Sequence, residues 1–261
     1  MPRRTYLVTG AASGIGRATT TLLRDRGHTV ITADLQGQDT DIAADLATLT
    51  GRAQLADNAR QLTAGCLDAV IACAGLAHFH PRTLRVNYFG TVATLEALRP
   101  LLAAGTDPRA VLVSSAAAIH PPDPAIVNAA LAGDEDTAVA AAQAAIDRGE
   151  GHTVYGSSKH ALVRWLRRTA ITDDWAGAGI PLNAIGPGTV TTPMTAPMLA
   201  DPAMREVVDA SVPMPLHGHA RPEQIAPLLA WLASPENTHV TGQILFADGG
   251  ADATLRGDTA W

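Results

Sequence analysis

The chain alternates short runs of apolar residues with longer segments in which apolar residues recur every three or four positions. The short runs favour strands and fall at residues 5–9, 28–34, 67–75, 109–115, 180–186 and 243–246. The helical period occupies residues 15–26, 50–64, 82–104, 153–176 and 222–233. Apolar runs without a polar face are typical of a parallel sheet that helices cover on both sides. We therefore predict one α/β domain over residues 1–261, a doubly wound parallel sheet of about seven strands.

Two segments depart from this alternation. Only ten residues separate Asp34 from Asp45, so a loop rather than a helix must lead to a short third strand at 41–46. Residues 119–151 begin with three prolines and continue as an alanine-rich stretch, which predicts one or two short inserted helices. We expect this insertion to serve packing or subunit assembly, because it contains no group of residues typical of a catalytic or binding site.

The composition excludes several classes of protein. Hydrophobic residues make up 47% of the chain and charged residues 17%, which excludes a disordered protein. The formal net charge is −6, so we expect no nucleic acid and no membrane as partner. No apolar run reaches about 18 residues and no signal peptide is visible. With only Cys66 and Cys73 as thiols, these features predict a soluble, cytoplasmic protein.

A glycine-rich turn links the first predicted strand to the first predicted helix. It contains Gly10, Ser13, Gly14, Ile15 and Gly16. Glycines in a strand–turn–helix context let backbone N–H groups approach a pyrophosphate at a helix N-terminus. The turn therefore predicts a dinucleotide site and a Rossmann-type sheet, although its spacing is not the commoner Gly-x-Gly-x-x-Gly.

Asp34 ends the second predicted strand, 18 residues past Gly16. A carboxylate there can accept hydrogen bonds from both hydroxyls of an adenosine ribose, and it repels a 2′-phosphate. Leu35 follows where an NADP enzyme often has arginine, so we predict NAD. A solvated acid at a strand end is the alternative. Around the same cofactor we expect Asp45, Leu46, Ala74 and Gly75.

Tyr155 and Lys159 stand four residues apart on a predicted helix, so their side chains share one face. For a phenol to act as general acid/base at neutral pH, its pKa must fall by about 3 units. One cation supplies about 1 to 3 units, so a second positive charge, such as an oxidised nicotinamide, would complete the shift. Because any helix can carry this pair by chance, the interpretation depends on the other motifs.

Polar side chains occupy two further positions of interest. Ser114 and Ser115 end a buried strand, at the sheet edge where ligands bind in open α/β folds. Asn87 lies inside a predicted helix, where asparagine is mildly unfavourable and invites an explanation. An exposed or locally bonded Asn87 side chain is the alternative.

Residues 189–221 hold four of the five methionines together with five prolines. Clustered methionine beside a catalytic edge suggests a mobile apolar lid over the substrate, and we expect Met194 and Met198 to contact it. Ordinary helix packing is the alternative. The pairs His78/His80 and His217/His219 raise the question of zinc, but without Cys or carboxylate partners at ligand spacing we predict no metal. His78, His120 and His217 remain candidates for the substrate pocket.

Taken together, the motifs resemble the short-chain dehydrogenase/reductase family over essentially the whole chain. The motifs that fall in the family's order are Thr9-Gly10…Gly14-Ile15-Gly16, Asn87, Ser115, Tyr155-x3-Lys159 and Pro187-Gly188…Thr192. The short link after Asp34 and the insertion at 119–151 look most like the bacterial 3α-hydroxysteroid dehydrogenase/carbonyl reductases. Coniferyl-alcohol dehydrogenases are the nearest alternative.

The resemblance implies roles for individual residues. Tyr155 would exchange a proton with the substrate oxygen, Lys159 would lower the pKa of Tyr155 and bind the nicotinamide ribose, and Ser115 would orient the substrate. Asn87 would hold a water in a proton relay. Around the cofactor, the resemblance adds Pro187, Gly188, Val190 and Thr192, the last two at the carboxamide.

The function that we predict is NAD-dependent interconversion of a secondary or allylic alcohol and its carbonyl, on an apolar cyclic substrate of hydroxysteroid or terpenoid type. An aryl-alcohol dehydrogenase is the first alternative. A non-catalytic NAD sensor or scaffold, and an epimerase or dehydratase, are the others.

Three departures from the family bear on these expectations. Cys73-Ala74-Gly75 stands where relatives have Asn-Asn-Ala-Gly, and Gly186 replaces a small side chain. The insertion at 119–151 adjoins the Tyr155 helix, which in many relatives forms a tetramer interface. We therefore expect the usual tetramer to be blocked or altered, leaving a homodimer or another non-standard homo-oligomer.

Overall fold

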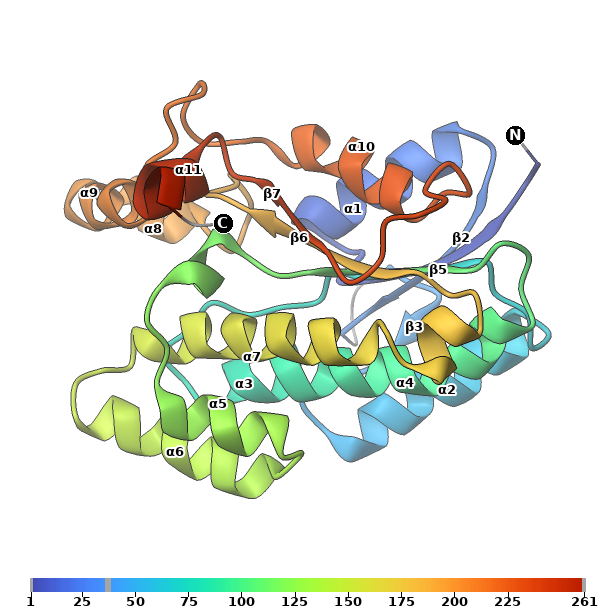
Figure 1. The fold of residues 1–261 in the computed structure, drawn as a ribbon, viewed down its shortest axis with the longest axis horizontal. Helices are drawn as coiled ribbons and strands as arrows, with labels where there is room; N and C mark the ends of the chain where they lie inside the picture. The colour runs from blue at the N-terminus through green and yellow to red at the C-terminus, as the bar shows by residue number, and fades with distance from the viewer. Residues whose placement is uncertain (1, 36–38, 260–261) are drawn as a thin grey trace.

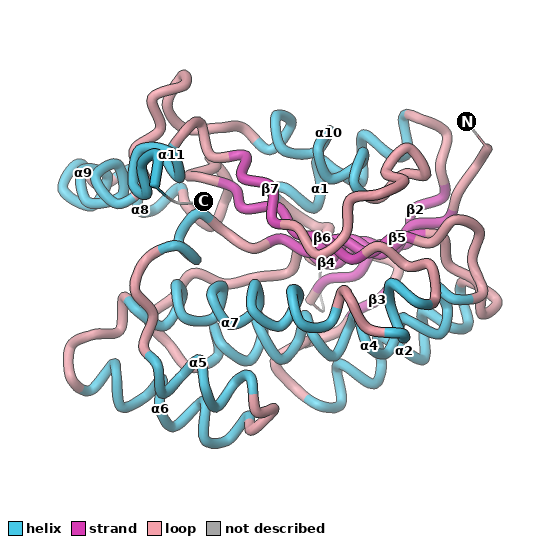
Figure 2. The backbone as a smooth tube through the Cα atoms, viewed as in Figure 1, coloured by secondary structure: helices cyan, strands magenta, loops and turns pink. Residues whose placement is uncertain are grey.

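The computed structural model describes residues 2–35 and 39–259. A sheet lies at its centre, between layers of helices (Figure 2). The sheet is parallel and has seven strands in the order β3-β2-β1-β4-β5-β6-β7. The strands are β1 (Thr5–Thr9), β2 (Thr29–Asp34), β3 (Ile42–Ala43), β4 (Ala69–Ala72), β5 (Arg109–Val113), β6 (Leu182–Pro187) and β7 (Ile244–Ala247). Each predicted strand is present, and the predicted parallel, doubly wound sheet is confirmed.

Helices cover both faces of the sheet (Figure 1). On one face lie α1 (Gly14–Asp25) and α10 (Pro222–Leu232), and on the other lie α2 (Leu49–Leu62), α4 (Thr91–Ala103) and α7 (Thr153–Thr169). Alternate strand residues enter two separate cores: Leu7 and Leu112 face the α2/α4/α7 side, whereas Val8 and Val111 face the α1/α10 side. Burial on both faces explains why apolar residues predominate in the strands.

The insertion forms two helices, α5 (Pro124–Leu131) and α6 (Glu135–Asp147), as predicted. Asp123 begins α5 by accepting the N–H groups of Ala125 and Ile126, and Asp134 begins α6 by accepting that of Thr137. Both helices pack beneath the amino-terminal part of α7 (Figure 1). The insertion therefore extends the core of that face rather than forming a separate domain.

The helix predicted over 82–104 is continuous but not uniform. It begins as α3 (Arg82–Leu84), widens into a π-helical turn, η1 (Arg85–Gly90), and continues as α4. The predicted helix 153–176 is too long, because α7 ends at Thr169 and a separate π-helical turn, η3 (Asp173–Gly177), follows. That turn buries Trp175 in the core, where it is 2% exposed.

Four of the remaining elements lie in the carboxyl-terminal part of the chain, and one follows β5. Two short helices, α8 (Ala196–Ala200) and α9 (Pro202–Ser211), occupy the segment 189–221. The tail forms α11 (Ala251–Arg256) and a 3-10 turn, η4 (Gly257–Thr259), and another 3-10 turn, η2 (Ala116–Ile119), follows β5. Across the described part of the chain, the helices are all too short or too polar to cross a membrane.

Candidate active site

A cavity of about 620 Å³ opens at the carboxyl ends of the strands. This volume lies within the range of small-molecule and cofactor sites. Every residue predicted to contact the cofactor lines the cavity: Gly10, Ser13, Gly14, Ile15, Gly16, Asp34, Leu35, Asp45, Leu46, Ala74, Gly75, Tyr155, Lys159, Pro187, Gly188, Val190 and Thr192. Ser115 and Met194 line it as well, whereas Asn87 and Met198 do not.

The glycine turn is shaped so that side chains do not fit. Gly10 has a φ of +65°, and a Cβ on it would lie 2.8 Å from the backbone nitrogen of Ala74. A Cβ on Gly16 would lie 2.2 Å from the carbonyl oxygen of Gly10. The turn therefore presents bare backbone at the N-terminus of α1, an arrangement that suits a dinucleotide pyrophosphate.

The Asp34 carboxylate is fixed at the edge of the cavity. Its Oδ2 accepts a hydrogen bond from the backbone N–H of Ala12 at 2.9 Å, and its Oδ1 accepts one from that of Leu35 at 2.8 Å. The bond from Ala12 ties the end of β2 to the glycine turn. The side chain lines the cavity, so it lies where the sequence places the adenosine ribose.

The ammonium group of Lys159 is buried beside Tyr155 on α7. Its Nζ donates to the carbonyl oxygen of Val113 at 2.8 Å and lies 5.9 Å from the centroid of the Tyr155 ring. Burial lowers the pKa of Lys159 to about 8. Burial also raises the pKa of Tyr155, while a hydrogen bond with Ser115 opposes this rise. The phenol therefore stays protonated at neutral pH in the cofactor-free site, and Lys159 is not among the groups that shift its pKa, so the expected lowering by Lys159 is not found here.

The two adjacent serines point to different partners. Ser115 opposes the rise in the pKa of Tyr155, and its Oγ accepts the backbone N–H of Ala117 at 3.1 Å. Ser114 is 2% exposed, and its Oγ lies 3.5 Å from the carbonyl oxygen of Lys159. The geometry therefore favours Ser115 as the serine that works with Tyr155.

Asn87 lies behind the cavity wall, within the π-helical turn η1. Its Oδ1 accepts the N–H of Leu76 at 2.8 Å, and its Nδ2 donates to the carbonyl oxygen of Leu76 at 2.9 Å. Nδ2 also lies 3.1 Å from the Oγ of Ser158, one residue from Lys159. Asn87 is fully buried, so the alternative of an exposed side chain is wrong. It holds the loop after Gly75 against the helix that carries Tyr155.

The methionines of segment 189–221 do not act as one set. Met194 lines the cavity and is 40% exposed, whereas Met198 lies outside its lining. Met214 accepts a hydrogen bond at Sδ from the backbone N–H of Thr189 and fills the space beside Gly188 and Gly249. Met214 therefore packs against two glycine-containing loops, neither in a helix nor in the cavity lining.

Several residues of the cavity were not singled out by sequence patterns. Arg82 lines it and forms an ion pair with Asp45 at 2.8 Å, and Leu76 lines it too. Cys73, which was noted only as a departure from the family, also lines it. Burial raises the pKa of Cys73 to about 12, so its thiol stays protonated at neutral pH. None of these positions carries a local signal, because their place in the cavity depends on loops.

The histidine pairs considered for zinc do not converge. His80 Nδ1 accepts the backbone N–H of Arg82, and His219 Nε2 lies 2.6 Å from the Asp209 carboxylate on α9. Within the described residues there is no group of three or more His, Cys, Asp or Glu that could hold a metal ion. Of the histidines considered for the substrate pocket, His78 lines the cavity, whereas His120 and His217 do not.

Comparison with known proteins identifies a matching family model and several similar proteins. A family model described as enoyl-(acyl carrier protein) reductase matches residues 10–252. A 3-alpha-hydroxysteroid dehydrogenase/carbonyl reductase from Comamonas testosteroni is 36% identical over 260 residues, covering 96% of this chain and 97% of the relative. A cis-4-hydroxycyclohexanecarboxylate dehydrogenase from Sinomonas cyclohexanicum is 31% identical, covering 96% and 97%.

Among solved structures, the 3-alpha-hydroxysteroid dehydrogenase from Pseudomonas sp. B-0831, crystallised with NADH, is similar over nearly its full length. It shares 38% sequence identity with this chain and superposes with a TM-score of 0.89. The alignment covers 98% of this chain and 99% of the other.

Proposed function

Because the chain belongs to the short-chain dehydrogenase/reductase family of oxidoreductases, we propose that it is an NAD-dependent alcohol dehydrogenase and ketone reductase. The observation that carries this proposal is the position of Tyr155 and Ser115, which line the same cavity as the glycine turn. An acid/base group and a dinucleotide cradle thus face one space.

In this site, bound NAD⁺ would accept a hydride during alcohol oxidation, and bound NADH would donate one during ketone reduction. Tyr155 would accept the proton of the alcohol oxygen during oxidation and return it during reduction. Ser115 would hydrogen-bond the same oxygen and orient it. Lys159 would place its charge beside the phenol and the nicotinamide ribose, and Asn87 would order a water at the end of a proton relay.

The preference for NAD rests on charge at the edge of the cavity. The Asp34 carboxylate faces the position expected for the adenosine ribose, and Leu35 beside it offers no cation. The 2′-phosphate of NADP would be repelled by this carboxylate, and Leu35, unlike an arginine at that position, has no positive charge to offset the repulsion. The NADH found in the Pseudomonas relative supports the same choice.

The proposed substrate is an apolar cyclic alcohol or ketone. The names of the Comamonas and Sinomonas relatives refer to a hydroxysteroid and a hydroxycyclohexane carboxylate, both of which are cyclic alcohols. Met194 and Pro193 line the cavity, and the segment 189–221 would act as the lid over such a substrate. The test is a panel of steroid, terpenoid and aryl alcohols with NAD and with NADP, followed by the absorbance of the reduced cofactor.

The catalytic assignment is tested by Tyr155→Phe. This variant removes one oxygen and should abolish turnover while leaving NADH binding nearly unchanged. Undiminished activity would remove Tyr155 as the acid/base group. A wild-type protein that binds NADH but turns over none of the alcohols would instead favour the sensor or scaffold alternative.

A further inference from the structure

We propose that Arg52, held by Glu135 of the insertion, is a positioning residue for the nucleotide side of the cavity. The inference rests on the proposed function only in requiring that this cavity binds a nicotinamide dinucleotide. It gives the insertion a role in cofactor binding, in addition to packing.

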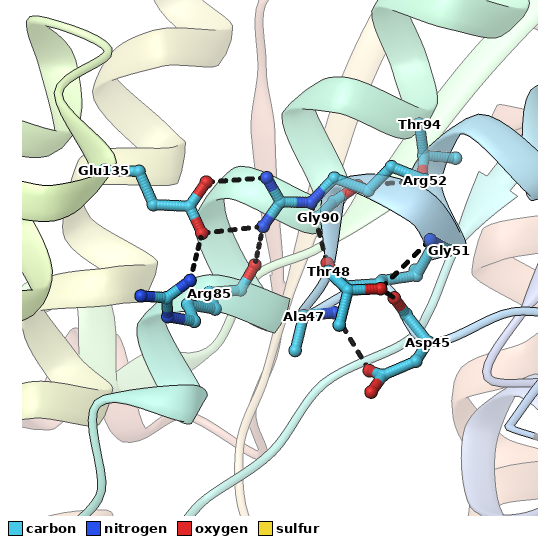
Figure 3. Close-up of polar contacts among 10 residues, drawn as sticks. Asp45, Ala47, Thr48, Gly51, Arg52, Arg85, Gly90, Thr94 and Glu135 are labelled. Carbon is cyan, nitrogen blue, oxygen red and sulfur yellow. Dashed lines mark hydrogen bonds and ion pairs between the residues drawn. The ribbon is translucent and has the colours of Figure 1, made fainter.

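The guanidinium group of Arg52 bonds in three directions (Figure 3). Its Nε donates to the carbonyl oxygen of Leu46 at 2.8 Å, and its Nη2 donates to that of Arg85 at 3.1 Å. Its two terminal nitrogens also bind the Glu135 carboxylate, at 2.6 and 3.0 Å. One side chain thus connects α2, the cavity-lining Leu46, the π-helical turn η1 and the insertion helix α6.

The contacts around Leu46 leave little room for adjustment. A Cβ on Gly51 would lie 2.1 Å from the carbonyl oxygen of Asp45, and a Cβ on Gly90 would lie 2.9 Å from Leu46. Helix α2 and the turn η1 therefore clamp residues 45–46 from two sides. Since Asp45 and Leu46 both line the cavity, a shift of this segment would move the cavity wall.

The chemistry of the pair explains why both partners are needed. The side chains of Arg52 and Glu135 are 9% and 19% exposed, so each charge is largely removed from water and depends on the other. Arg85 adds a second cation at 3.4 Å from the Glu135 carboxylate. Only arginine offers donors in a rigid planar fork that can bind two carbonyl groups and a carboxylate together. Lysine at position 52 would keep the charge and lose this geometry.

The first experiment compares Arg52→Lys with Arg4→Lys. Arg4 is a matched control, because it is also buried and donates to three backbone carbonyl groups, but at the amino ends of β1 and β4, away from the cavity. Melting temperature and the Kd for NADH and for NADPH are measured on each protein, together with kcat at saturating cofactor.

We expect Arg52→Lys to weaken dinucleotide binding by about 3- to 30-fold. We expect kcat at saturating cofactor to stay within about threefold of the wild type, because the change weakens binding rather than the chemical step. Arg4→Lys should lower the melting temperature without weakening binding more than about twofold. Equal weakening by both variants would overturn the proposal. A wild type that prefers NADPH would refute the proposed cofactor but leave this comparison valid.

The second experiment addresses Glu135 and does not depend on Arg52→Lys folding. Glu135→Gln removes the carboxylate charge at a position on α6 that does not line the cavity. We expect it to weaken NADH binding in the same direction as Arg52→Lys, and the double variant to be weakened less than the product of the two single effects. Unchanged binding in Glu135→Gln, or independent effects in the double variant, would overturn the role of the insertion.

Discussion

Lys159 is the only lysine among the 19 lysine and arginine residues of the chain. Arginine stays charged in proteins, whereas a buried lysine can lose its proton near neutral pH. Burial brings the pKa of Lys159 to about 8, and the Val113 carbonyl holds its ammonium group in place. The one lysine of the chain is therefore the residue whose ammonium group, beside Tyr155, can lose its proton near neutral pH.

We expect the ammonium group of Lys159 to titrate near pH 8 in the cofactor-free protein, against 10.5 for the ordinary group. Because lysine occurs once, labelling with isotopic lysine gives a single side-chain NMR signal whose pH dependence reports this pKa directly. A signal that titrates above about pH 10 would contradict the buried, titratable ammonium.

The same pKa predicts how stability changes with pH. The folded protein binds the Lys159 proton more weakly than the unfolded chain, so charging the group opposes folding below pH 8. As pH rises from about 8 to about 10.5, this penalty disappears and the wild type gains stability relative to Lys159→Met. Thermal unfolding of both proteins across this range measures the gain, and a constant difference in Tm would contradict it.

Ser115 affects Tyr155 through the hydrogen bond that opposes the burial-raised pKa. Alcohol oxidation requires the phenolate, so the rate rises with pH through the pKa of Tyr155. Ser115→Ala should raise that pKa, move the oxidation profile to higher pH, and lower the rate at neutral pH by about 100-fold or more. The profile of kcat/KM against pH measures this.

Ser114→Ala is the matched control for Ser115→Ala. Its hydroxyl contacts the Lys159 backbone at 3.5 Å rather than the phenol, so we expect a much smaller shift of the profile. The same profile in all three proteins would mean that Ser115 does not act on Tyr155.

At the scale of whole elements, the strands could be predicted because each one carries its own signal. A strand buried on both faces is a run of apolar residues, and the runs at 67–75 and 109–115 contain β4 and β5. The π-helical turn η1 could not be predicted in the same way. Asn87 in this turn bonds to Leu76, and Gly90 packs on Leu46, so its shape depends on contacts distant in sequence.

Some residues of the candidate site could likewise be predicted from the sequence, and others could not. Residues at strand ends and in the glycine turn could be assigned, since parallel strands bring their carboxyl ends to one edge. Arg82 could not be assigned from the sequence. The pairing of Arg52 with Glu135 could not be assigned either, because it joins residues 83 positions apart. Met194 and Met198 are four residues apart, yet only Met194 lines the cavity.

The helices α8 and α9 have the structure expected of a movable lid. Among their described residues none is buried, whereas α10 buries Ile225, Leu229 and Leu232. We expect backbone amides of α9 to exchange hydrogen much faster than those of α10 in the free protein, because local opening exposes little apolar surface. Mass-spectrometric hydrogen exchange measures both helices in one experiment.

Binding should slow exchange in the lid. With NADH and a ketone or alcohol ligand bound, we expect protection of α8 and α9 and little change in α10, which does not line the cavity and serves as an internal reference. Exchange in α9 as slow as in α10 before any ligand is added would contradict a mobile lid.

For the molecule as a whole, the insertion changes which surface is open to other subunits. Helices α5 and α6 lie against the amino-terminal part of α7 (Figure 1), and the backbone N–H of Asp123 donates to the Oγ of Ser157 on α7 at 2.8 Å. The opposite end of α7 carries the exposed residues Arg167 and Arg168. A tetramer packed through the full length of α4 and α7 would therefore have to displace the insertion.

We expect the protein in solution to have the mass of a dimer or of another assembly that leaves α4 and α7 outside its interface. Light scattering coupled to gel filtration measures the mass at several concentrations. Arg168→Glu reverses a charge on the exposed end of α7 and should leave that mass unchanged, because the surface is not an interface in this arrangement. A four-chain mass that Arg168→Glu lowers would show that the usual tetramer forms despite the insertion, since like charges introduced into a real interface disrupt it.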